Sequence, residues 1–203
     1  ISNIEEDGGA GTRSVADILE LSLNTGATWL LMQMGGGEVN AKARNTWHKY
    51  MVDHYQFGKA TGIEQGYEDE GSIPDPNDGF GLNIQYANTS FGQGMTATPL
   101  QMAAALSGVI NGGTYYQPHL VEQVVDGSGK TTKVANKVIK SDVVSPKVSQ
   151  QMITLMQGVV GRNYALYGLK KPNDSYVIGG KTGTAEIPKP TGGYYEDRFN
   201  GTF

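Results

Sequence analysis

The chain has 203 residues, with 16 Lys and Arg against 20 Asp and Glu, and its formal net charge is -4. No basic stripe is dense enough to follow a nucleic-acid backbone, and the lack of cysteine excludes disulfides and thiolate metal sites. No run of about 18 apolar residues exists that could span a membrane, and residues 1–9 resemble neither a membrane anchor nor a signal peptide.

The N-terminal quarter predicts three helices. Ser14 with an acidic residue at Asp17 forms a capping pattern, which predicts a helix that ends near residues 22–24. The apolar run 27–34, stopped by three glycines, predicts a second helix. The amphipathic segment 41–55 predicts a third.

A long loop and a strongly signalled helix follow. Residues 66–82 are rich in glycine, proline and acids, which indicates a surface loop. Thr98 and Gln101 form a capping box around a proline, so a helix is expected over 99–110. Its apolar positions are expected to be buried: Met102, Ala103, Leu106 and Val109.

The C-terminal half mixes strands with one more helix. The β-prone runs 120–125 and 131–138 are separated by a glycine-rich turn and predict a hairpin. Ser145 before a proline predicts a helix start, with the helix reaching about residue 160. Residues 176–182 favour an extended conformation.

The stretch GGKTGTAEIP at 179–188 first suggests the end of a phosphate-binding loop. That signature requires a glycine where this chain has Ser175, so the spacing is wrong. A phosphate loop must also open a helix, whereas Pro188 and Pro190 follow at positions where a helix needs backbone donors. Lys181 must therefore serve another kind of site.

A strand that carries this lysine suits the binding of a carboxylate. Thr182 and Thr184 alternate with Gly183, so both hydroxyls are expected on one strand face. Lys181 is then expected on the opposite face, where it can contact groups behind the strand. Gly183 would let a neighbouring backbone pack close.

A second short motif accompanies K-T-G. Ser22-Leu23-Asn24 is a Ser-x-Asn triplet, and the pair of motifs is typical of β-lactamases and penicillin-binding proteins. The run ANTSFGQGMTATPLQMAAALSGVINGG at 87–113 strongly resembles the transpeptidase domain of class B penicillin-binding proteins. The segments at 14–27, 57–63 and 118–124 are similar to the same family, so the resemblance covers nearly the whole chain.

The resemblance implies an α+β fold, with an antiparallel sheet flanked by helices plus an all-helical subdomain. It implies a D,D-transpeptidase that cross-links peptidoglycan stem peptides through a serine acyl-enzyme and is acylated by β-lactam antibiotics. The implied catalytic residues are Ser22, Asn24 and Lys181, and the implied substrate-binding residues are Thr182, Gly183 and Thr184. Ser22 would relay a proton, Asn24 would hold the substrate amide, and the Thr184 position would offer an oxyanion-hole N–H.

The resemblance also implies the setting of the parent protein. No cofactor and no metal ion are implied. The parent would act at the outer face of the bacterial cytoplasmic membrane, held by an N-terminal anchor. Its partners would be stem peptides, β-lactams and proteins of cell-wall synthesis or division, with SFGQG favouring a septal role.

One family motif is missing. No serine of this chain is followed by lysine three positions later, so the S-x-x-K nucleophile motif is absent, and the family continues beyond residue 203. Residues 1–203 are therefore expected to be the central part of a transpeptidase domain, with the nucleophile upstream. Alone, the chain is expected to be inactive, with exposed apolar faces that reduce its stability or bind a complementary piece.

Other interpretations stay open. A noncatalytic penicillin-binding-like module, acting as sensor or scaffold, would share the two motifs without acylation. A β-lactamase would need a deacylating base, and no residue can be given that role. His48, His54 and His119 lack the spacing of metal ligands, and Tyr194 and Tyr195 either line the substrate groove or cover the core.

Overall fold

The computed structural model describes residues 11–170 and 175–203. Its elements in chain order are α1 Val15–Glu20, α2 Asn24–Met34, α3 Ala41–Lys49, η1 Tyr50–His54, α4 Leu82–Thr89, α5 Pro99–Ile110, β1 Tyr115–Tyr116, β2 Gln123–Val125, β3 Thr131–Lys133, β4 Val138–Lys140, α6 Pro146–Tyr167, β5 Gly183–Pro188 and β6 Tyr194–Thr202. The strands form three antiparallel pairs, β1 with β4, β2 with β3 and β5 with β6. Helices with small antiparallel sheets confirm the predicted α+β class.

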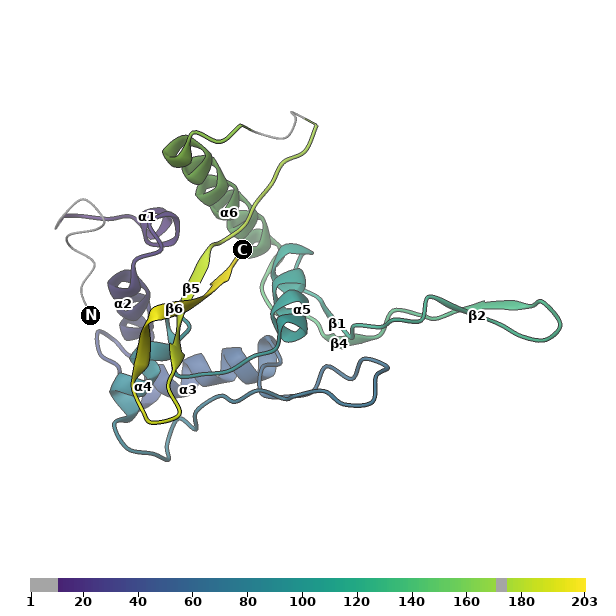
Figure 1. The fold of residues 1–203 in the computed structure, drawn as a ribbon, viewed down its shortest axis with the longest axis horizontal. Helices are drawn as coiled ribbons and strands as arrows, with labels where there is room; N and C mark the ends of the chain where they lie inside the picture. The colour runs from purple at the N-terminus through teal and green to yellow at the C-terminus, as the bar shows by residue number, and fades with distance from the viewer. Residues whose placement is uncertain (1–10, 171–174) are drawn as a thin grey trace.

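The helices gather into a body from which one ribbon projects (Figure 1). α1 packs on α6, α2 packs on α3 and α4, and α5 packs on β1 and α6. The β2–β3 ribbon extends far from this body, at the right of the view. Among the described residues no helix combines the length and apolarity needed to cross a bilayer. Residues 1–9, where we predicted neither anchor nor signal peptide, lie outside the described part.

The start of α1 is as predicted, and the start of α2 is not. Ser14 Oγ accepts a hydrogen bond from Asp17 N at 3.2 Å, and Ser14 N donates to Asp17 Oδ2 at 2.7 Å, which completes the capping box. α1 ends at Glu20, two residues before the predicted end. α2 begins at Asn24 instead of residue 27, because the 22–24 segment is a tight link between two helices, not a helix end.

α5 has the predicted bounds but buries a different face. Both halves of the Thr98–Gln101 capping box are present. The prediction that Met102 and Leu106 are buried is wrong, since they are 53% and 46% exposed. The buried positions are Gln101, Ala104, Ala105 and Gly108. The small side chains of this face let α5 approach β1 and α6 closely.

The loop after residue 66 is confirmed up to residue 81, but α4 was not expected. Its sequence, LNIQYANT, has no helical apolar period, yet Tyr86 and Thr89 on it are buried. Gln101 fixes the loop to α5, because its Nε2 donates to the carbonyls of Lys59 and Glu70 at 2.8 and 2.9 Å. A buried amide thus organises a loop that lacks regular structure.

The C-terminal half follows the prediction with shifts in position. The hairpin exists, and Val124 faces Thr132 in its register. α6 runs seven residues past the predicted end at residue 160 and stops at Gly168, whose φ of 61° suits glycine. β5 starts at Gly183, so residues 176–182 lie before this strand and not within it. Tyr194 and Tyr195, expected either to line the substrate groove or to cover the core, lie on β6.

Candidate active site

All six predicted site residues meet at one cavity of about 450 Å³. The cavity lies between the α1–α2 link, the segment after α4, one side of α6 and the start of β5. Its polar lining consists of Ser22, Asn24, Ser90, Lys181, Thr182 and Thr184, together with Gly183. The two motifs, about 160 residues apart in the sequence, thus form a single site.

Lys181 connects the two motifs directly. Its Nζ donates to Ser22 Oγ at 2.5 Å and to the carbonyl of Thr182 at 2.7 Å. Burial lowers the pKa of Lys181 below its ordinary value, because desolvation disfavours the charged form. The Lys181 ammonium group therefore loses a proton more readily than an exposed lysine does. One of its N–H groups donates to the Ser22 hydroxyl.

The prediction that Lys181 faces away from the threonines is wrong. Lys181, Thr182 and Thr184 all line the same cavity. The alternation of strand faces applies only within a strand, and β5 begins at Gly183, after the lysine. Lys181 thus lies in an irregular segment that lets it turn toward Ser22.

Ser22 stands in an unusual backbone conformation. Its φ is 54°, in the left-handed region that a non-glycine residue adopts only at a cost. Two backbone hydrogen bonds close the turn, from Ser22 N to Leu19 O at 3.2 Å and from Leu23 N to Ile18 O at 2.9 Å. This turn ends α1, starts α2 and leaves the Ser22 hydroxyl within reach of Lys181.

Glycines bring the lysine segment close to its neighbours. A Cβ on Gly183 would overlap with Thr202 Oγ1 of β6, so a larger residue at this position requires the Thr202 side chain to move. A Cβ on Gly180 would lie 2.6 Å from the Phe203 ring. The Gly180 N–H also donates to Met156 O of α6 at 3.2 Å. These contacts fix the direction from which Lys181 enters the cavity.

The rest of the cavity lining is apolar. It is formed by Val15, Ile18, Leu19, Leu23, Ala27, Leu30, Phe91, Met152 and Leu155. Ser90 and Phe91 also line the cavity, although neither is among the predicted site residues. The signal was present, because both belong to the 87–113 run that carries the family resemblance.

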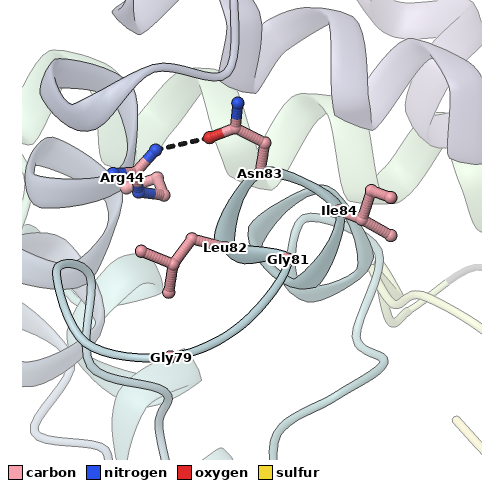
Figure 2. Close-up of a pocket in the computed structure, with 6 residues that line it drawn as sticks. All are labelled: Arg44, Gly79, Gly81, Leu82, Asn83 and Ile84. Carbon is pink, nitrogen blue, oxygen red and sulfur yellow. Dashed lines mark hydrogen bonds between the residues drawn. The ribbon is translucent and has the colours of Figure 1, made fainter.

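A second cavity, of about 400 Å³, contains none of the predicted site residues (Figure 2). Figure 2 shows the Arg44 guanidinium directed at the Asn83 side chain, to which it donates a hydrogen bond. Arg44 Nε also donates to Pro76 O at 2.8 Å. The arginine thus ties the long loop to α4. In the described ranges, no group of three or more His, Asp or Glu side chains could hold a metal ion.

Comparison with known sequences places these features in a family. The family model described as the penicillin binding protein transpeptidase domain matches residues 1–203. Stage V sporulation protein D of Bacillus subtilis (strain 168) is 34% identical over 195 residues, which cover 94% of this chain and 27% of that protein. Peptidoglycan D,D-transpeptidase MrdA of Acinetobacter baumannii is 29% identical over 190 residues, which cover 88% of this chain and 26% of that protein. The chain thus spans about a quarter of the length of these relatives.

Solved structures share the fold. Penicillin-binding protein 3 from Mycobacterium tuberculosis superposes with a TM-score of 0.75 at 24% identity, over 92% of this chain and 40% of that one. Penicillin-binding protein 2X from Streptococcus thermophilus gives a TM-score of 0.73 at 24% identity, over 92% of this chain and 26% of that one. Because the family model matches the chain from end to end and these structures share its fold, the chain belongs to the penicillin-binding protein transpeptidase domain family.

Proposed function

We propose that the chain supplies two of the three active-site motifs of a peptidoglycan D,D-transpeptidase, which cross-links stem peptides through a serine acyl-enzyme. The observation that carries this proposal is the 2.5 Å contact between Lys181 Nζ and Ser22 Oγ beside the two threonines. The name of the relative MrdA includes this activity. Solved neighbours complexed with aztreonam and with ampicillin support β-lactam binding.

In this proposal Thr182 and Thr184 bind the carboxylate of the substrate. Their hydroxyls donate to the terminal carboxylate of a D-alanyl-D-alanine peptide or to the carboxylate of a β-lactam. The Lys181 ammonium lies at the same wall of the cavity and attracts the anion. A hydrogen bond to a charged group contributes about 1.5–3 kcal/mol, so the carboxylate orients the ligand strongly.

Ser22 and Lys181 act on the leaving group. The serine nucleophile, in a part of the parent outside these 203 residues, gives its hydroxyl proton to a base in that part and attacks the carbonyl carbon, and the scissile C–N bond breaks. Ser22 Oγ–H donates its proton to the departing amine and takes one from Lys181 Nζ, with which it shares a hydrogen bond. The lowered pKa of Lys181 assists this transfer. An amine of a second stem peptide then attacks the acyl-enzyme and returns a proton through Ser22 to Lys181, and the released serine takes its proton back from its own base.

Residues 1–203 form one incomplete transpeptidase domain in this proposal, and the chain alone does not turn over substrate. Large apolar side chains at the surface support this view, including Met102 and Leu106 on α5 and Phe199 and Phe203 in and after β6. Such surfaces fit contact with the remainder of the domain. The parent acts at the outer face of the cytoplasmic membrane, on stem peptides, with cell-wall synthesis or division proteins as partners.

The test is intact-mass analysis and peptide mapping of the full-length parent after incubation with benzylpenicillin. A single adduct on a serine outside this chain is expected. An adduct on Ser22 would overturn the division of roles proposed for the two motifs. A folded parent that forms no adduct would overturn the enzyme proposal in favour of a noncatalytic penicillin-binding-like module.

A further inference from the structure

Two hydroxyl groups outside the predicted motifs join α2 to the segment after α4, beside the cavity. Thr28 lies one helical turn after Asn24, and its Oγ1 donates to the carbonyl of Asn24 at 3.0 Å. The same oxygen lies 3.3 Å from Ser90 Oγ, although the two residues are 62 positions apart. Ser90 Oγ also donates to Ala87 O at 2.6 Å. The chain of contacts thus ends at a predicted site residue.

Each of these hydroxyls has one hydrogen and two lone pairs. Thr28 donates to the Asn24 carbonyl and Ser90 donates to the Ala87 carbonyl, so the contact between the hydroxyls shares one of these two hydrogens. Either hydroxyl can be the donor in that contact. In both cases the contacts run from Ala87 O through Ser90 and Thr28 to the Asn24 carbonyl.

Ser90, at one end of this series of hydrogen bonds, lies next to a buried and hydrogen-bonded residue. Its neighbour Thr89, the last residue of α4, is only 3% exposed. Thr89 Oγ1 accepts a hydrogen bond from Trp47 Nε1 of α3 at 3.0 Å and donates to Tyr86 O at 2.8 Å. Buried hydrogen bonds therefore fix the end of α4 to α3, and they restrict the position of the Ser90 backbone.

The start of α2, at Asn24, lacks a capping hydrogen bond from its N-cap side chain. Asn24 is the first residue of α2, and the N-cap residue Leu23 makes no side-chain capping bond. The residue before it, Ser22, has the strained left-handed φ of 54°. The Ser90–Thr28 bridge is a side-chain contact between the beginning of α2 and the residue that follows α4.

We propose that Thr28 and Ser90 are positioning residues, which hold the first turn of α2 so that the Asn24 amide meets the acylamide group of the ligand. This inference rests on the proposed function and on the role that the family resemblance implies for Asn24, which is to hold the substrate amide. Neither hydroxyl needs to touch the reacting atoms. The pair acts through the backbone of Asn24, so its loss should affect ligands with an acylamide group more than ligands without one.

The experiment measures the second-order rate of acylation of the full-length parent by two β-lactams. Benzylpenicillin has an acylamide side chain, and 6-aminopenicillanic acid lacks one. Thr28→Val keeps the shape but removes the hydroxyl, and it should slow acylation by benzylpenicillin about two- to tenfold, the value of one neutral hydrogen bond. Acylation by 6-aminopenicillanic acid should stay within about twofold of the wild-type rate, below the loss of one such bond.

Three further variants sharpen the test. Thr28→Ser keeps the hydroxyl and should restore the wild-type rate. Ser90→Ala removes the other hydroxyl of the pair, and it should slow acylation by benzylpenicillin at least as much as Thr28→Val, because Ser90 also lines the cavity. Thr154→Val is the matched control: Thr154 Oγ1 makes the same kind of bond, to Gln150 O at 3.1 Å, on an exposed part of α6. This control should leave both rates unchanged.

The outcomes separate this inference from the function on which it rests. A wild-type parent that neither β-lactam acylates overturns the proposed function and the positioning role together. A normally acylated wild type with an equally fast Thr28→Val variant overturns only the positioning role. Equal slowing with both β-lactams overturns it as well, since that result indicates a general structural defect.

Discussion

Replacement of Lys181 by methionine should separate stability from catalysis. Lys181→Met keeps the apolar stem and removes the ammonium group, which contacts Ser22 Oγ at 2.5 Å and Thr182 O at 2.7 Å. A hydrogen bond from a charged donor is worth about 1.5–3 kcal/mol, which corresponds to about ten- to a hundredfold in rate. We therefore expect benzylpenicillin to acylate the Lys181→Met parent slower by that factor.

The stability of the chain should change in the other direction. Burial lowers the pKa of Lys181 in the folded state, so between that pKa and the ordinary value near 10.4 the unfolded chain binds more protons. The contribution of Lys181 to the free energy of unfolding therefore rises with pH across this window. The methionine variant lacks this contribution, and at pH 7 it should be at least as stable as the wild type.

The assays are labelling of the parent with a fluorescent penicillin and urea unfolding at several pH values, with differences taken against the wild type. Lys189→Met is the matched control, because Lys189 lies after β5 with its Nζ 5.7 Å from the Tyr195 ring centroid. The control should keep the wild-type labelling rate. Labelling of Lys181→Met at the wild-type rate, or a loss of stability at pH 7 larger than in the control, would refute the reasoning.

Three further predictions concern residues that shape the site and its support. Gln101→Leu leaves three backbone partners unpaired, at about 1–3 kcal/mol each, so urea unfolding should show a loss of at least about 3 kcal/mol; a loss below about 1 kcal/mol would contradict this. Gly183→Val places a side chain against Thr202, so acylation of the parent should slow about tenfold or more, whereas Gly201→Ala, which meets no atom within 4 Å, should be neutral. The pKa of Asp17 is lowered first by the Ser14 backbone N–H and then by the Ser14 hydroxyl, and Ser14→Ala removes the hydroxyl hydrogen bond. The stability that this carboxylate adds above its ordinary pKa near 3.9 is lost as the pH falls, so the variant should show a smaller drop in melting temperature between pH 7 and pH 3.

The sequence was most informative where structure depends on neighbours in the chain. Thr98 and Gln101 lie within one turn of each other and predicted the start of α5 at the correct residue. Ser14 and Asp17 did the same for α1. The glycine-rich turn between residues 125 and 131 predicted the hairpin. In each case the deciding hydrogen bonds join groups a few residues apart, so their partners are visible in the sequence.

The faces that these elements bury are set by contacts distant in the sequence. The larger apolar residues of α5 predicted which face of the helix is buried. In the structure, β1 and α6 contact the face that carries alanine and glycine instead. α4 has no apolar period, and its Thr89 is buried because Trp47 of α3 bonds to it. Periodicity describes which residues could be buried, whereas the shape of the neighbouring elements decides which residues are.

The site shows the same division. The sequence by itself determined which residues could form it, because Ser22, Asn24 and the segment 181–184 match two short motifs whose residue types suit carboxylate binding and proton transfer. Only the tertiary structure decided that Lys181 meets Ser22, that both lie on the same side as the threonines, and that Ser90 and Phe91 complete the wall. The physical reason is that these contacts depend on a left-handed turn at Ser22 and on an irregular segment before β5, and tertiary packing, not residue spacing, sets both conformations.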